Sequence, residues 1–489
     1  MDILTLLTLF SFILFVYFYH RGKRTNFPPG PMGLPFVGFA PFLGENPAIT
    51  YMKLGKKYGS IFSVRIGSKD WIVLNDYKSI LGAYAKNEHA FSGRPDVVML
   101  QVLTGFGHGM GLIDYGEMWE SQRVFEAKAL RGISARRGVE NAVVDEIRHL
   151  NEIFCKSNEQ PIDPKIHFGK AVANTVMNIT IGQRLPYDDE RFIEIVTRLK
   201  DYWTDETDGK LFGIMFFFPV LRHLPKFRTT FAKFCKSVKR IKEMIKEYVD
   251  EHKLTFDPRH PRDFIDEFLV EAQKEQQGNF TDVQLIHAVN EFFNAGIETT
   301  TDALLWIFLE LAQHPESQTM IDTELLNVIG RSGTPSWKHK NKMPYTSAFI
   351  QEVERVHTMA PLSMPRKTTS CVQINGYEIP KDTPVMPNFW AVHRDPKLFE
   401  NPDEFLPERF LDEGNNFLPS KYVIAFSVGP RNCMGEQIAR KEMFLFIVGI
   451  LQHFRIEADQ KAYSLPPTDK GVYGIAYSPL KYKVRFIQK

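Results

Sequence analysis

The stretch from Thr281 to Gln313 constrains what this chain can fold into more than any other part of the sequence. Thr281 followed by Gln284 is typical of a capping box at a helix start, and His314-Pro315 ends the helical pattern. At about 1.5 Å per residue, this helix is roughly 50 Å long. It must therefore cross most of any domain that contains it, so the sequence predicts a core of helices around it.

The rest of the chain predicts a mainly α protein with a smaller β part. "IFSVRIG" (61–67) and "WIVLND" (71–76) have the pattern of strands, most of 117–360 is typical of helices, and 372–388 favours short strands and turns. No linker or repeat follows the proline-rich "FPPGPMGLP" (27–35). We therefore expect residues 25–489 to form a single large domain.

Composition excludes several classes of protein. The 44% hydrophobic and 24% charged residues are ordinary for a globular chain, and a net charge of +2 without a basic tract argues against a nucleic-acid partner. The four cysteines have no CxxC spacing, which argues against a disulfide framework and a structural zinc site. The bulk of the protein is therefore expected in a reducing compartment.

The N-terminus carries an apolar run from Ile3 to Tyr19, followed by Arg21, Lys23 and Arg24. Its length of roughly 25 Å as a helix is at the short end for crossing a bilayer. A cleaved signal peptide, the alternative, would carry its positive charge before the apolar run. The order of charges thus predicts an uncleaved transmembrane signal anchor with its basic flank over residues 1–24, and a catalytic body that faces the cytosol.

The centre of the long helix, "FFNAGIETTTD" (292–302), contains residues that disfavour helices. Phe292, Ala295, Gly296 and Thr299 share one face by their spacing, and Glu298 lies beside it. Small residues on a buried face let a flat group approach, and an acid next to an alcohol can pass protons. A helix-packing notch explains the same window equally well.

The stretch "FSVGPRNCMG" (426–435) places Cys433 at the start of another helical pattern. The helix dipole and free backbone N–H groups favour its thiolate, and Arg431 offers a fork for a carboxylate. A lone thiolate that faces open space suits haem iron, because this ligand favours cleavage of the O–O bond.

On these motifs the sequence resembles the cytochrome P450 haem-thiolate monooxygenases, and in particular their animal microsomal branch. The family's motifs are met, in order and over essentially the whole chain, by Trp119 and Arg123, by Ala295, Gly296, Glu298 and Thr299, by Glu352 and Arg355, by "PERF" (407–410), and by Phe426, Gly429, Arg431, Cys433 and Gly435.

The resemblance implies the cytochrome P450 fold, haem b as cofactor, Cys433 as the metal ligand, and Glu298 and Thr299 as catalytic residues. The cofactor contacts that it implies are Trp119, Arg123, Arg94, Arg366, Arg431, Phe426, Gly429, Gly435 and Ala295. Microsomal relatives often carry His at the position of Arg366. Glu352, Arg355 and Arg409 are implied to support the cysteine loop.

The function that the resemblance implies is insertion of one atom of dioxygen into a small lipophilic substrate, such as a steroid, fatty acid or xenobiotic. Electrons would come from NADPH through NADPH–cytochrome P450 reductase, with cytochrome b5 as a second candidate donor. The location would be the endoplasmic reticulum membrane, crossed once. Candidate docking residues for the reductase are Arg123, Lys128, Lys421 and Arg440.

Two alternatives remain open at this point. A haem-binding carrier or sensor would lack oxygenase turnover, whereas the acid–alcohol pair favours an oxygenase. A serine hydrolase could use Ser427 in "AFSVG" (425–429), but Ala425 replaces the first glycine of the hydrolase motif. "GFGHGMG" (105–111) satisfies no nucleotide-binding motif and predicts a mobile loop near the substrate.

Overall fold

The computed structural model describes Thr5, Thr8 and Ser11, and residues 26–135, 138–203, 206–274, 278–458, 465–474 and 476–489. The predicted anchor, residues 1–24, thus lies outside the described residues apart from three isolated positions. Within the described part of the chain, no helix is long and apolar enough to cross a membrane. The predicted mainly α fold with a smaller β part is confirmed.

The chain forms two compact units by its internal contacts. The small unit comprises Met1–Pro95, Leu362–Asp395 and Val428–Arg431, and the large unit comprises Asp96–Pro361, Pro396–Ser427 and Asn432–Lys489. The prediction of one domain over 25–489 stays a prediction.

The small unit is built on a four-stranded sheet in the order β1-β2-β6-β3 and a two-stranded sheet of β4 and β5. Its strands are β1 (Ile61–Ile66), β2 (Lys69–Leu74), β3 (Arg366–Lys367), β4 (Val372–Ile374), β5 (Tyr377–Ile379) and β6 (Pro384–Pro387). Its helices are α2 (Pro47–Tyr58), α3 (Tyr77–Leu81), α15 (Phe389–His393), the 3₁₀ helices η1 (Ala40–Phe42) and η3 (His89–Phe91), and the π-helix η2 (Gly82–Lys86).

The hairpin of β1 and β2 confirms the two strands predicted near the N-terminus. Ile66 pairs with Lys69, which leaves a two-residue turn, and Gly67 at its start has a φ of +60°. Such turns require positive φ, which glycine adopts without strain. Beyond the hairpin, β2 pairs in parallel with β6, and β6 pairs antiparallel with β3.

The large unit is mostly helical. Its helices are α4 (Val98–Thr104), α5 (Glu117–Ala135), α6 (Gly138–Lys156), α7 (Pro164–Ile181), α8 (Glu190–Trp203), α9 (Glu206–Phe217), η4 (Pro219–His223), α10 (Pro225–Thr255), α11 (Phe264–Lys274), α12 (Asp282–Gln313), α13 (Pro315–Val328), η5 (Trp337–Lys342), α14 (Pro344–His357), η6 (Pro407–Phe410) and α16 (Glu436–Leu451). Its strands are β7 (Phe454–Ala458), β8 (Gly471–Tyr473), β9 (Tyr477–Pro479) and β10 (Val484–Gln488), which pair antiparallel as β7 with β10 and β8 with β9.

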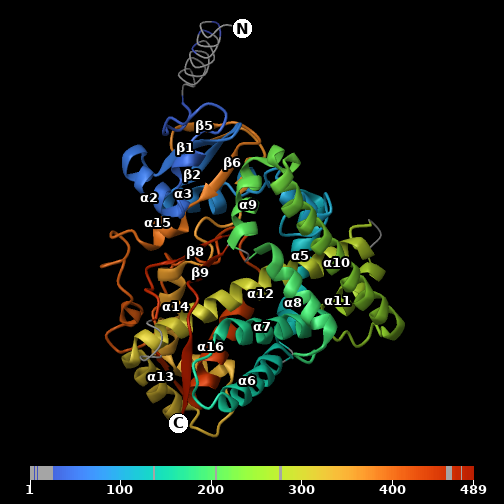
Figure 1. The fold of residues 1–489 in the computed structure, drawn as a ribbon, viewed down its shortest axis with the longest axis vertical. Helices are drawn as coiled ribbons and strands as arrows, with labels where there is room; N and C mark the ends of the chain where they lie inside the picture. The colour runs from blue at the N-terminus through green and yellow to red at the C-terminus, as the bar shows by residue number, and fades with distance from the viewer. Residues whose placement is uncertain are drawn as a thin grey trace. The chain divides into compact units, whose positions relative to one another are not determined.

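The predicted long helix is confirmed as α12, which packs against α7, α10, α14 and α16 (Figure 1, where α12 is yellow). Every residue from Thr300 to Leu311 is buried. A helix that is enclosed on all sides is apolar all round, which explains the run "ALLWIFLELA". The core of the large unit therefore lies around the second half of α12.

The predicted capping box is only half formed. The Thr281 hydroxyl accepts a hydrogen bond from the Gln284 N–H at 3.2 Å, as expected. The Gln284 side chain, however, does not cap Thr281 in return: its Oε1 accepts from the N–H of Gly109 at 3.2 Å. A tertiary contact has thus replaced the local one.

Candidate functional site

Cys433 lies three residues before the first residue of α16, near the end of the loop that its motif defines. Its N–H donates to the Phe426 carbonyl at 2.9 Å, which closes the loop on itself. The N–H groups of Gly435 and Glu436 donate to the sulfur. The helix start therefore presents Sγ with backbone donors on one side, as the sequence predicted.

The charge state of Cys433 depends on opposing influences. The side chain is exposed, yet desolvation by the surrounding protein raises the pKa of the thiol. The two amides and Arg123 act in the opposite direction, whereas the Glu436 carboxylate adds to the rise in pKa. A bound metal cation deprotonates a coordinating thiol outright. Cys433, with the groups around its sulfur, therefore fits the role of a metal ligand.

Trp119 and Arg123 of α5 lie close to Cys433 in the large unit. Trp119 is buried in an apolar cluster with Met110 and Ile113, against which Met434 packs. The Arg123 guanidinium donates to Asn432 Oδ1 at 2.5 Å, and burial lowers its pKa while Cys433 and Glu126 raise it. The predicted pair thus meets the residues on both sides of the cysteine.

The three other predicted arginines lie together in the small unit, and all are at least nine-tenths buried. Arg94 donates to the Pro365 carbonyl at 2.8 Å, and Arg431 donates to the Ser92 carbonyl at 2.6 Å. Arg366 donates to the Val428 carbonyl at 3.1 Å and stacks on the Tyr84 ring at 3.6 Å. Three buried guanidinium groups concentrate positive charge, which suits binding of carboxylates.

Gly429 is the position of the motif that tolerates no side chain. Its φ is +77°, and a Cβ there would lie 1.7 Å from the Tyr84 carbonyl oxygen. Both constraints require glycine. The cysteine motif is therefore bound to η2 by a close approach of the two backbones within the small unit.

The predicted charge cluster of Glu352, Arg355 and Arg409 forms. Glu352 and Arg355 of α14 are fully buried, with the guanidinium on both carboxylate oxygens at 2.7 Å. Glu352 also accepts from Arg409 Nε at 3.0 Å and from the Leu406 N–H at 2.8 Å. This cluster joins α14 to η6.

Arg440, a candidate docking residue, is held within the large unit. Its guanidinium bonds the buried Glu354 carboxylate at 3.1 Å, lies 3.3 Å from Glu436, and covers the Phe426 ring at 5.2 Å. Arg123 is likewise engaged with Asn432. Lys128 and Lys421, in contrast, are exposed.

The centre of α12 does not present one shared face, as was predicted for Phe292, Ala295, Gly296 and Thr299. Ala295 and Thr299 are exposed, although most of the helix around them is buried. Gly296 faces α7, where a Cβ would lie 3.0 Å from Val176, and Phe292 stacks edge-on against Phe264 of α11. Ala295 and Thr299 thus lie on an exposed face of α12 and Gly296 lies on the face that packs against α7, because packing against α7 and α11 fixes the rotation of the helix.

The acid–alcohol pair is also divided between two sides of α12. The Glu298 carboxylate accepts from Lys165 Nζ of α7 at 3.2 Å. The Thr299 hydroxyl donates to the Ala295 carbonyl at 2.6 Å, so its oxygen can still accept a hydrogen bond. Sequence reasoning missed Lys165, because nothing within its own neighbourhood marks it as a partner of α12.

The loop predicted to be mobile, residues 105–111, is tied to α12. Glu291 Oε2 accepts from the N–H groups of Met110 and Gly111 at 2.7 and 2.9 Å, next to the bond from Gly109 to Gln284. His287 bonds the Leu103 carbonyl at 3.1 Å. Side chains from one face of α12 therefore hold a segment that was expected to be a mobile loop near the substrate.

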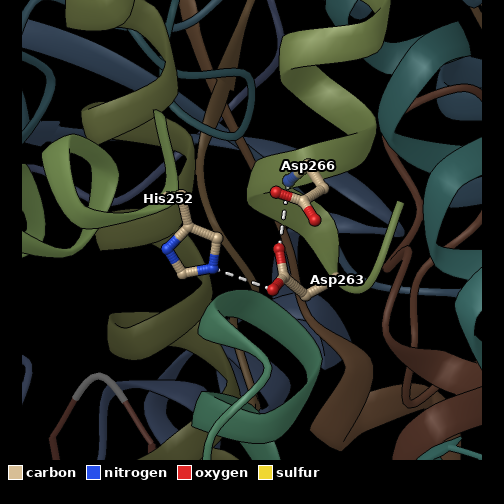
Figure 2. Close-up of side chains that lie close together, drawn as sticks. All are labelled: His252, Asp263 and Asp266. Atoms are coloured by element: carbon tan, nitrogen blue, oxygen red, sulfur yellow. Dashed lines mark hydrogen bonds and ion pairs between the residues drawn. The ribbon is translucent and has the colours of Figure 1, made fainter. Parts of the chain in front are cut away.

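A further polar cluster joins the end of α10 to the start of α11 (Figure 2). His252 bonds the Tyr248 carbonyl through Nδ1 at 2.7 Å and Asp263 through Nε2 at 2.9 Å. Asp263 accepts from the Asp266 N–H at 3.0 Å, and Arg262 bonds the Asp266 carboxylate. Two acceptors on one imidazole imply its protonated form, so this cluster is an ion pair rather than a set of metal ligands.

Comparisons with known proteins agree with the geometry. A family described as cytochrome P450 matches residues 28–486. Cytochrome P450 2D3 of Rattus norvegicus is 34% identical over 490 residues, which cover 97% of this chain and 95% of that protein. Cytochromes P450 2J2 and 2U1 of Homo sapiens are 32% and 30% identical, covering 97% and 95% of this chain and 94% and 90% of theirs.

The residues present fit the haem b that proteins of this family bind. Cys433 supplies a sulfur ligand at a helix start, with Trp119 and Arg123 beside it in the large unit. The exposed residues at the centre of α12, Ala295 and Thr299, are small. Ser427, the nucleophile of the hydrolase alternative, lies inside the cysteine motif, and nothing supports that alternative or the carrier. The chain belongs to the cytochrome P450 family and is a haem b monooxygenase that resembles the animal branch of that family.

Proposed function

We propose that this cytochrome P450 oxidises a small lipophilic substrate, of the steroid, fatty acid or xenobiotic type. The observation that carries the proposal is the exposure of Ala295 and Thr299 in the middle of a largely buried helix. Such a gap within a packed core indicates room for a cofactor and an apolar ligand. When bound, the haem supplies a thiolate-ligated iron that activates oxygen.

The assignments of individual residues are part of this proposal. Cys433 holds the iron, and Trp119, Arg123, Arg94, Arg366 and Arg431 bind the haem carboxylates. Backbone carbonyl groups of the small unit accept hydrogen bonds from Arg94, Arg366 and Arg431. The space for the haem is shaped by Phe426, Gly429, Gly435 and Ala295. The Cys433 loop is braced by Glu352, Arg355 and Arg409.

Thr299 and Glu298 are proposed to handle protons for the reaction. Thr299 Oγ1 donates to Ala295, so its free lone pairs can accept a hydrogen bond from a water molecule. Glu298 is half-buried and adjacent in sequence, so it can exchange a proton with that water once its carboxylate leaves Lys165.

The substrate class is tested by titrating the purified ferric protein with lipids, steroids and xenobiotics, and following the Soret band as water leaves the iron. Ala295→Leu should weaken binding of every ligand that shifts the band, because the larger side chain fills the gap. Val283→Phe places bulk on an exposed position of the same helix and should change nothing. Equal affinities in Ala295→Leu and wild type would contradict the proposal.

Electrons are proposed to come from NADPH through NADPH–cytochrome P450 reductase, with cytochrome b5 as a second donor. Exposed Lys128 and Lys421 remain candidates for docking, whereas Arg123 and Arg440 are engaged in contacts of their own. Changing both lysines to Glu should raise the KM for the reductase, and high salt should reduce the difference. An unchanged KM would exclude this surface.

Residues 1–24 are proposed to anchor the catalytic region, 25–489, in the endoplasmic reticulum membrane, crossed once with the body in the cytosol. Exposed Ile214, Val220 and Leu224 are proposed to add a second, weaker contact. Removing residues 1–24 should reduce membrane association and leave the haem spectrum intact. If expression of the full-length chain yields a cleaved, secreted protein, the prediction of an anchor is contradicted.

A further inference from the structure

Asp302 is a buried carboxyl group on α12, one helical turn after Glu298, and its side chain is fully shielded from solvent. Its Oδ2 accepts from the Ser478 hydroxyl of β9 at 2.7 Å. Among the described residues, Oδ1 has no hydrogen-bond partner. A buried acid that is half satisfied costs stability, so its presence requires an explanation.

Lys165 lies between the two carboxyl groups. It stands in the first turn of α7, bonds Glu298, and lines a small pocket with Glu298, Asn294 and Thr301. Burial alone would lower the pKa of Lys165, but Glu298, Asp302 and Asp163 together raise it. One cation is therefore shared between two acids on neighbouring turns of α12.

The charge on Asp302 changes near neutral pH. Burial raises its pKa to about 7, the Glu298 charge adds to the rise, and Lys165 and the Ser478 hydroxyl oppose it. Glu298 and Lys165 are the charged groups of the described residues that act on Asp302; Tyr482 bonds the Leu305 carbonyl nearby, and Asp163 acts through Lys165. While Asp302 is neutral, Lys165 has a single carboxylate to hold.

We propose that Asp302 is a positioning residue that decides whether Lys165 holds Glu298 or releases it toward Thr299. Charged Asp302 competes for the Lys165 ammonium, which frees the Glu298 carboxylate to serve the hydroxyl on the other side of the helix. Neutral Asp302 leaves Glu298 bound to Lys165. This inference rests on the proposed role of Thr299 and Glu298 and adds its regulation.

The first test measures product and hydrogen peroxide formed per NADPH consumed, from about pH 6 to 8, with saturating substrate. Wild-type coupling should rise through the pH at which Asp302 loses its proton. Asp302→Asn, which stays neutral, should lose the rise, so that its coupling stays at the low-pH value of wild type over the whole range. Lys165→Met should have the opposite effect and give high coupling at every pH.

Ser478→Ala removes the donor that lowers the pKa of Asp302, so the midpoint should move to higher pH. The matched control is Glu442→Gln, which removes another buried carboxyl group whose pKa is raised, to about 8, on α16. Its coupling profile should follow that of wild type. A purely structural Asp302 would instead move coupling in the same direction in Asp302→Asn and Lys165→Met, and this result would overturn the proposal.

A second readout needs no turnover. Because the folded-state pKa of Asp302 lies above the unfolded value near 4, its contribution to stability is fully present below about pH 4 and is lost as pH rises through about 7. The difference in unfolding temperature between Asp302→Asn and wild type should therefore grow in favour of the variant from about pH 4 to about pH 7 and level off above it. An invariant difference would overturn the titration on which the proposal depends.

Different results would overturn the role of Asp302 and the proposed function. Wild-type protein that consumes NADPH with the reductase but shows no change of coupling in Asp302→Asn overturns the role of Asp302 alone. Wild-type protein that forms neither product nor peroxide overturns the proposed function, and the role of Asp302 with it.

Discussion

The Cys433 loop and the centre of α12 each hold a reactive side chain beside open space, but they hold it by different means. Backbone groups hold the loop. The Cys433 N–H donates to the Phe426 carbonyl, two further N–H groups donate to the sulfur, and Gly429 has a positive φ. At the centre of α12, Lys165 of α7 offsets the charge of Glu298, and the Ser478 hydroxyl of β9 donates a hydrogen bond to Asp302.

The two regions therefore respond to different kinds of substitution. The hydrogen bonds that close a backbone-held loop involve no titratable side chain, and the loop fails when its support or its ligand is removed. A side-chain-held centre keeps its fold when one group changes, and the change appears in chemistry instead.

The largest effect is expected for Cys433→Ser, because no other group in the loop can replace the thiolate. The reduced protein treated with carbon monoxide should lose the far-red-shifted Soret band that thiolate ligation produces. Cys155→Ser, at an exposed cysteine, should keep the band. A normal band in Cys433→Ser would refute the assignment of the ligand.

The second-largest effect is expected when the Glu352 carboxylate, which supports the Cys433 loop, is removed. Glu352→Gln leaves the buried Arg355 and Arg409 without their shared carboxylate, and breaking a buried ion pair costs about 3–5 kcal/mol. The free energy of unfolding by urea should fall by that amount, with loss of haem content. Glu316→Gln, at a carboxylate that is 70% exposed, should cost less than about 1 kcal/mol. Similar losses in the two variants would show that the loop needs no brace.

Thr299→Val should leave haem content and stability nearly unchanged and lower product formed per NADPH, with more hydrogen peroxide released. General acid catalysis is typically worth about 10²–10⁴-fold, so coupling should suffer far more than substrate affinity. Thr180→Val is the matched control, because the Thr180 hydroxyl makes the same bond to the preceding turn, at 2.7 Å, within α7. Unchanged coupling in Thr299→Val would make Thr299 a packing residue.

The same contrast explains what the sequence could predict. The determinants of the Cys433 loop lie within ten consecutive residues, and the Glu352–Arg355 pair lies on one helical turn, so local spacing was sufficient. The partners at the centre of α12 are distant: Lys165 and Ser478 come from other elements far along the chain. No local pattern marks such partners.

The rotation of α12 was equally hidden. Spacing placed Gly296 with Ala295 and Thr299, but residues on adjacent sides of a helix differ by only 100°, and the packing of Val176 against Gly296 decided the outcome. Gln284 shows the same limit, since its local capping role was replaced by a bond to Gly109. Local propensity predicted the elements, and tertiary packing set which way they face.

The parallel pairing of β2 with β6 has a consequence for synthesis of the chain. Ile72 pairs with Val385, so one side of β2 waits for a partner about 310 residues downstream. At translation rates of roughly 5–20 residues per second, this wait lasts about 15–60 s. An apolar strand with an open edge is a template for aggregation during that time. The nascent protein is therefore expected to depend on chaperones, or on early shelter of its N-terminal hairpin, until the ribosome has delivered β6.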